Sequence, residues 1–262
     1  MNLNIEGKHA LVCGSTQGIG KSAAIELAIL GARITLLARN EDELKKVCAE
    51  LPNPGSIKHD YICADFSRTA ELKSIVEKYV AESGPIHILV NNTGGPPGGL
   101  ITEAKTEEFI STFNNHLICN HILVQAVLNG MKESGYGRVI NIISTSVKQP
   151  LKGLGVSNTV RAAVANWSKT LAGEVAKYNI TVNNVLPGAT DTLRLKSLLE
   201  AKSKRSGKSI EELKQEMVSE IPMARFAGAN EIANVIAFLA SPAAAYITGI
   251  NVPVDGGRTQ SL

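Results

Sequence analysis

The chain has 262 residues, of which 44% are hydrophobic and 19% are charged, and its formal net charge is +3. This composition is typical of a globular protein, and no apolar run is long enough to cross a bilayer. The first residues lack the basic and apolar regions of a signal peptide, so we expect a cytoplasmic protein with no membrane partner. The small charge and an aromatic content of 4% argue against nucleic acid as a partner. The four cysteines are scattered, with no CxxC pair or clustered histidines, which argues against a metal site or a disulfide framework.

Short apolar runs along the chain predict β-strands, because they are bounded by Gly, Asn, Asp or Pro. Between them, apolar residues recur with helical spacing, as in 72–80 and in 232–239 before Pro242. Strands buried on both faces need helices above and below, so the alternation predicts one α/β domain over 1–262: a Rossmann-type, doubly wound sheet of seven parallel strands with helices on both faces. The strands are expected in the runs HALVCGS, RITLLAR, HDYICAD, IHILVNN, GRVINIIS, ITVNNVLPG and INVPVDG.

One irregular insert separates the sixth and seventh predicted strands. It covers about residues 189–222 and is polar and helix-prone. We expect it to form a lid over the carboxyl edge of the sheet. Its basic residues, together with the low aromatic content, are interpreted as a solvated helix surface.

A glycine-rich turn follows the first predicted strand, and residues 21–30 then have the character of a helix. Glycines permit a tight turn and close backbone approach, and a helix N-terminus offers free N–H groups and partial positive charge to a pyrophosphate. The GxxxGxG spacing differs from the commoner GxGxxG fingerprint, and such a turn can also be purely conformational. The candidate cofactor residues here are Gly14, Ser15, Thr16, Gln17, Gly18, Ile19 and Gly20.

Further motifs come after later strands: Asp65, Asn91-Asn92-Thr93-Gly94, Pro187-Gly188 with Thr192, Thr248-Gly249, and Asp255-Gly256-Gly257. Singly, such residues can cap helices or make turns. Together with the glycine turn they resemble the short-chain dehydrogenase/reductase family over nearly the whole chain. The resemblance implies a nicotinamide dinucleotide, with Asp65 and Asn91 around the adenosine half. Around the nicotinamide it implies Pro187, Gly188 and Thr192, while Phe66, Asn92 and Gly94 complete the expected cofactor site.

The end of the second strand bears on which cofactor is bound. A carboxylate there would bind the ribose 2′-hydroxyl, whereas a basic residue would accept a 2′-phosphate. The strand ends with Ala38-Arg39, so we expect NADP(H) to be preferred over NAD(H). The alternative is a surface arginine near Glu41 or Glu43.

The resemblance breaks at the catalytic positions. The family uses a serine, a tyrosine thirteen residues later and a lysine four beyond that, with an upstream asparagine. Ser144 matches the serine, but Ser157 and Arg161 stand at the tyrosine and lysine positions, and His116 at the asparagine position. A serine hydroxyl is a far weaker acid than a phenol, and arginine stays protonated. The ordinary proton donor is therefore expected to be absent.

Two classes of function remain open. The first is an NADP(H)-dependent oxidoreductase acting on a carbonyl or alcohol, in which His116 or a water chain handles the proton. In this class Arg161 holds the ribose hydroxyls or an anionic substrate group, and Ser157 orients a bound oxygen. The second is a non-catalytic dinucleotide-binding or sensing protein. The general resemblance is to 3-oxoacyl-carrier-protein reductases, and it implies a homo-oligomer, most often a tetramer.

Overall fold

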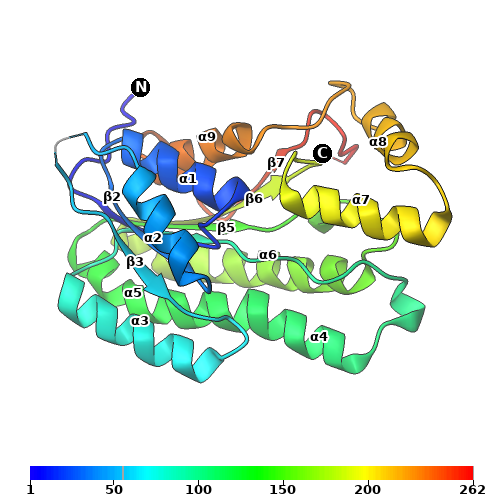
Figure 1. Cartoon of the computed structure of the whole chain (residues 1–262). Coiled ribbons are helices and arrows are strands. Elements are labelled where there is room, and N and C mark those ends of the chain that lie inside the picture. The colour runs from blue at the N-terminus through cyan, green and yellow to red at the C-terminus, as the bar shows by residue number, and fades with distance from the viewer. Residues whose placement is uncertain (55, 262) are drawn as a thin grey trace.

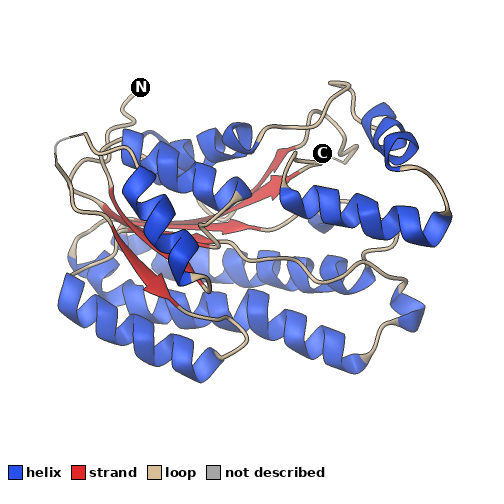
Figure 2. Cartoon of the chain, in the orientation of Figure 1, coloured by secondary structure: helices blue, strands red, loops and turns tan. Residues whose placement is uncertain are grey.

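The structure is a computed structural model that describes residues 1–54 and 56–261. Within these residues, seven strands form one sheet in the order β3-β2-β1-β4-β5-β6-β7. Every neighbouring pair is parallel, which confirms the predicted Rossmann-type α/β fold (Figures 1 and 2). The strands are β1 (His9–Cys13), β2 (Arg33–Ala38), β3 (Asp60–Cys63), β4 (Ile88–Asn91), β5 (Gly137–Ile142), β6 (Ile180–Pro187) and β7 (Asn251–Val254).

Helices cover both faces of the sheet (Figure 1). Because side chains alternate along a strand, Ala10 and Val12 of β1 enter one core, whereas Leu11 and Cys13 enter the other. The first core is completed by α1 (Gly18–Ile29), α2 (Glu41–Glu50) and α9 (Ala229–Ala240). The second is completed by α3 (Thr69–Ser83), α5 (Cys119–Glu133) and α6 (Gly155–Val175). Burial on both faces explains the continuous apolar runs of the strands.

A row of asparagine amides, three of them buried and the last half-buried, crosses the second half of the sheet. Asn91, Asn141, Asn184 and Asn251 stand in register on β4, β5, β6 and β7. The side chains form a chain of hydrogen bonds, in which each Nδ2–H donates to Oδ1 of the next residue. The distances are 2.8 Å from Asn91 to Asn141, 3.0 Å from Asn141 to Asn184 and 2.8 Å from Asn184 to Asn251. Buried polar groups are costly unless they are paired, so this row favours one register of these four strands.

The remaining helices lie at the carboxyl edge and its surroundings. After the short turn Ile101–Glu103, α4 (Thr106–Phe113) runs through a π-helical turn (Asn114–Ile118) directly into α5. Between β6 and β7 come α7 (Leu193–Ser206) and α8 (Ile210–Ser219), which share a small apolar cluster. Further 3₁₀ turns are Thr145–Val147, Ala176–Tyr178 and Pro242–Ala244. In the part of the chain that the structure describes, no helix combines the length and apolarity needed to cross a membrane.

Candidate active site

The glycine turn joins β1 to α1 and depends on its three glycines. Gly14 and Gly18 have φ values of +57° and +54°, which side-chain-bearing residues rarely adopt. A Cβ on Gly20 would lie 2.1 Å from the Gly14 carbonyl oxygen, so this position allows the helix to pack on the turn. Asn92 holds the turn, because its Nδ2 donates to the Gly14 carbonyl oxygen over 3.2 Å. The helix begins at Gly18, three residues before the predicted start at Lys21.

The start of α1 is open for a ligand. Its N-cap residue, Gln17, makes no capping hydrogen bond through its side chain, so the first N–H groups of the helix stay free. Gly14, Gln17 and Gly18 line the cavity described next. A glycine turn with uncapped helix N–H groups fits the phosphates of a dinucleotide.

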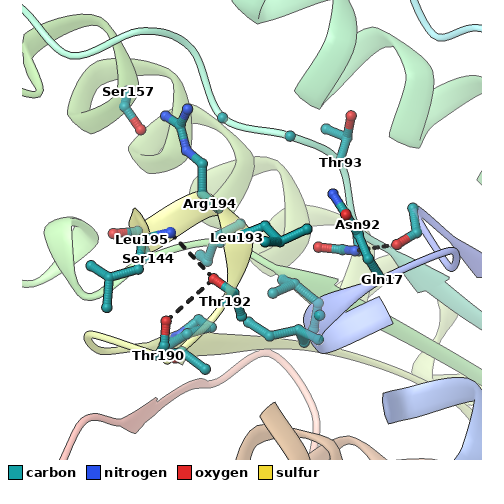
Figure 3. Close-up of a pocket in the computed structure, with 18 of the residues that line it drawn as sticks. Gln17, Asn92, Thr93, Ser144, Ser157, Thr190, Thr192, Leu193, Arg194 and Leu195 are labelled. Atoms are coloured by element: carbon teal, nitrogen blue, oxygen red, sulfur yellow. Dashed lines mark hydrogen bonds between the residues drawn. The ribbon is translucent and has the colours of Figure 1, made fainter. Parts of the chain in front are cut away.

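A cavity of about 680 Å³ lies at the carboxyl ends of the strands, under the start of α7 (Figure 3). Its position is that expected for ligand binding in open α/β sheets, where the strand order reverses between β1 and β4. The structure brings together most of the predicted site. The predicted residues that line the cavity are Gly14, Thr16, Gln17, Gly18, Ile19, Arg39, Asp65, Phe66, Asn92, Gly94, Ser144, Ser157, Arg161, Pro187, Gly188 and Thr192.

Three predicted cofactor residues lie behind the cavity wall instead. Asn91, expected around the adenosine half, is buried, and its side chain belongs to the amide row. Ser15 is also buried, and its Oγ donates to the Leu37 carbonyl oxygen over 3.4 Å. Gly20 is a packing position, as its contact with Gly14 shows. These residues support the site without lining it.

His116, the candidate proton donor, lies behind the cavity wall as well. Its side chain is only 3% exposed and does not line the cavity. Burial, followed by the positive charge of Arg161, lowers the pKa of His116 to about 2. The imidazole is therefore neutral near pH 7 and has no proton of low pKa to give to a substrate. The neighbouring Asn115 lines the cavity, because the π-helical turn changes which side chains face it.

Two serine side chains, Ser144 and Ser157, line the cavity at the end away from Arg39. Ser144 follows β5, and its Oγ accepts a hydrogen bond from the Ser146 N–H over 3.1 Å. This contact leaves the Ser144 hydroxyl proton available to another acceptor. Ser157 lies in the first turn of α6 and points into the same space (Figure 3). The two hydroxyls are suited to hold a substrate oxygen.

Arg161 lies one turn beyond Ser157 on α6. Its Nη1 donates to the Ile142 carbonyl oxygen over 2.7 Å, which fixes the guanidinium beside the end of β5. Burial, with a smaller contribution from the charge of Arg194, lowers the pKa of Arg161 to about 10. Arg161 is still a cation near pH 7, so it cannot accept a proton as a general base.

Arg39 lies at the opposite end of the cavity. It is exposed and lines the cavity, whereas the alternative partner Glu41 pairs with Lys45 over 2.9 Å. Asp65 is nearby, and its pKa is lowered first by the Ser67 N–H and to a smaller extent by Arg39. This end of the cavity has the donors and the charge that a nucleotide phosphate would need.

The insert between β6 and β7, expected as a lid, adds lining residues that the sequence does not single out. The start of α7 supplies Leu193, Arg194 and Leu195 to the cavity lining, and Met217 of α8 also contacts it. Thr192 caps α7, since its Oγ1 accepts the Leu195 N–H over 3.4 Å (Figure 3). The Thr-x-x-Leu pattern was a usable signal for the helix start, but periodicity alone does not show where the Arg194 side chain points.

Known proteins resemble this chain in sequence and in fold. The family described as enoyl-(acyl carrier protein) reductase matches residues 14–259. A 3-oxoacyl-[acyl-carrier-protein] reductase of Pseudomonas aeruginosa is 34% identical, over 99% of this chain and 100% of its own. An NADPH-dependent reductase of Bacillus subtilis is 31% identical, over 97% and 99%. Among solved structures, L-sorbose reductase from Gluconobacter frateurii, complexed with NADPH and L-sorbose, has a TM-score of 0.92 at 32% identity, with 100% of both chains covered.

Fold and site together define a Rossmann-type α/β protein with a glycine turn at the mouth of a cavity. The match of the family over residues 14–259 and the full-length relatives specify the class further. The chain belongs to the short-chain dehydrogenase/reductase family.

Proposed function

We propose that the protein is an NADP(H)-dependent oxidoreductase that acts on a carbonyl or alcohol substrate with altered acid/base residues. The observation that carries the proposal is the single cavity wall that joins the glycine turn and Arg39 to Ser144, Ser157 and Arg161. The names of the relatives, which include NADPH-dependent and 3-oxoacyl reductases, support the same class of reaction.

The chain's own residues would hold the cofactor along this wall. The turn and the open start of α1 would bind the pyrophosphate, and Arg39 the 2′-phosphate. Asp65, with Phe66, would border the adenosine half, and Pro187, Gly188 and Thr192 the nicotinamide half. When bound, the cofactor would supply or accept the hydride.

The altered residues divide the remaining work differently from a tyrosine-lysine pair. Ser144 and Ser157 would donate hydrogen bonds to the substrate oxygen and orient it. The cationic Arg161 would stabilise negative charge that develops on that oxygen. Since the imidazole of His116 is neutral and buried, we assign the proton to water that enters the cavity.

Turnover tests the proposal against the alternative of a non-catalytic binding or sensing protein. We expect the wild type to oxidise NADPH slowly with members of a broad carbonyl panel. Ser144→Ala should lower kcat/KM by about tenfold or more, because it removes one oriented donor to the reacting oxygen. Its NADPH affinity should stay unchanged. NADPH binding without turnover of any carbonyl or alcohol would favour the alternative.

Arg39 should determine the cofactor preference. Arg39→Gln removes a charge-assisted contact worth about 1.5–3 kcal/mol, or roughly 10- to 100-fold in NADPH affinity, and should leave NADH affinity unchanged. Titration of both cofactors into both proteins measures this. The matched control is Lys46→Gln, which removes an exposed charge on α2 that does not line the cavity. Equal NADPH affinity in wild type and Arg39→Gln would place Arg39 outside the cofactor site.

A further inference from the structure

Two arginines from different helices converge on one point of the cavity. Gly95 lies on the loop after β4, and a Cβ placed there would be 3.3 Å from Nη2 of Arg194 and 3.6 Å from Nη2 of Arg161. Arg194 extends from the start of α7 into the cavity (Figure 3), and it donates a hydrogen bond to the Pro96 carbonyl oxygen of this loop. Because Gly95 has no side chain, the space beside both guanidinium groups stays open.

The pair has no acidic partner among the residues that the structure describes. Neither Arg161 nor Arg194 forms a salt bridge in residues 1–54 and 56–261, whereas Arg258, another arginine of the lining, pairs with Glu220. The carboxylate of the lining belongs to Asp65, which lies beside Arg39 at the other end. Two neighbouring cations disfavour each other, so an anion between them would relieve a real electrostatic cost.

The free donors suit an oxyanion. Arg161 uses Nη1 for the Ile142 carbonyl oxygen, and its Nε is buried with no hydrogen-bond partner among the described residues. Its Nη2 faces the Gly95 side, and so does Nη2 of Arg194, which uses one N–H for the Pro96 carbonyl oxygen and keeps its second N–H for a ligand. Guanidinium groups bind carboxylates and phosphates through paired N–H donors, which gives both affinity and orientation.

The cofactor's phosphates have other partners. The glycine turn and the start of α1 supply N–H groups for a pyrophosphate, and Arg39 lies where a 2′-phosphate would bind. Arg161 instead shares its part of the wall with Ser157, one turn earlier on α6. We propose that Arg161 and Arg194 form a subsite for an oxyanion carried by the substrate, so that the substrate is an acidic carbonyl or alcohol compound. Its substrate role rests on the function proposed above.

Calorimetry on the NADPH-saturated protein tests the subsite directly. Malonate and inorganic phosphate are titrated separately at constant ionic strength, and the tighter ligand shows whether the subsite prefers a carboxylate or a phosphate. We expect saturable binding to the wild type. Arg194→Gln should weaken that binding by about tenfold or more, the loss expected for a charge-assisted contact. Lys196→Gln, an exposed charge on the same helix outside the lining, should bind like the wild type.

Three results would overturn the subsite. The first is that neither anion binds saturably, and the second is that wild type and Arg194→Gln bind the anion equally. The third is that NADPH abolishes anion binding, because the arginine pair would then belong to a cofactor phosphate. Failure of the proposed function is seen separately, as absent NADPH binding or absent turnover. In that case the same titrations on the free protein still measure whether Arg194→Gln removes the anion. If carbonyls turn over, the wild type should prefer acetoacetate to methyl acetoacetate, and Arg194→Gln should lose that preference.

Discussion

Acidification from about pH 7.5 to about pH 5 is expected to lower the free energy of unfolding by about 4 kcal/mol, because two imidazoles are buried in neutral form. Burial, with Arg33 and His87 nearby, lowers the pKa of His9 to about 4, although Asp60 acts in the opposite direction. His116 is lowered further, to about 2, beside Arg161. Both pKa values in the folded protein lie below the ordinary histidine pKa of about 6.5.

The direction follows from proton uptake. Below about pH 6.5 the unfolded chain binds a proton at each histidine, whereas the folded protein does not until much lower pH. The stability that comes from keeping these two imidazoles neutral is therefore fully present above about pH 6.5 and is lost as the pH falls. The loss continues down to the folded-state pKa, which is about 4 for His9 and about 2 for His116. At pH 5 each of the two histidines lowers the free energy of unfolding by about 2 kcal/mol. This is a large share of the roughly 5–15 kcal/mol that is typical of a domain.

Urea unfolding at both pH values measures this loss. His116→Asn should remove about 2 kcal/mol of the pH-dependent loss, since the amide does not titrate. His9→Gln should remove a similar amount, although it also disturbs a 2.7 Å hydrogen bond between His9 Nε2 and Thr35 Oγ1. The control His121→Asn removes an exposed imidazole on α5 and should keep the wild-type loss. An unchanged pH dependence in His116→Asn would contradict the buried neutral state.

The fold was predictable because its signals are local. Apolar runs ended by Gly, Asn, Asp or Pro gave the strands, and residues 72–80 and 232–239 had the spacing of one-sided helices. The glycine turn needed no tertiary information, since positive φ at Gly14 and Gly18 follows from the geometry of the turn itself.

The site is harder to predict where packing between distant segments of the chain determines which side chains reach the cavity. Asn91 looked like part of a nucleotide site, but its buried amide pairs with Asn141 on the neighbouring strand. The resemblance places His116 at the asparagine position by sequence spacing alone, which does not reveal the π-helical turn over Asn114–Ile118. Arg194 was counted as part of a polar insert, because its approach to Gly95 depends on where α7 packs. None of these features has a periodic signal in the sequence.

Restoring the tyrosine and lysine is the change with the largest expected gain in activity. The double variant Ser157→Tyr with Arg161→Lys places a phenol in the first turn of α6, at a position that lines the cavity. A phenol beside a lysine is a usable proton donor, whereas a serine hydroxyl is a far weaker acid. Positioned acid catalysis is commonly worth about 10²- to 10⁴-fold, so reduction of neutral β-ketoesters should rise by about that range.

Initial rates of NADPH oxidation with methyl acetoacetate measure the gain, and NADPH affinity is determined for every protein in parallel. Ser157→Phe serves as the matched control, because it adds the ring without the acidic hydroxyl and should gain nothing. An increase in Ser157→Tyr with Arg161→Lys, but not in Ser157→Phe, would show a working pocket that lacks only its acid. If the wild type already reduces neutral β-ketoesters rapidly and the double variant is slower, then Ser157 and Arg161 are themselves an efficient catalytic pair. The assignment of the proton to water would in that case be wrong, because a water-dependent step would have improved when a positioned phenol was supplied.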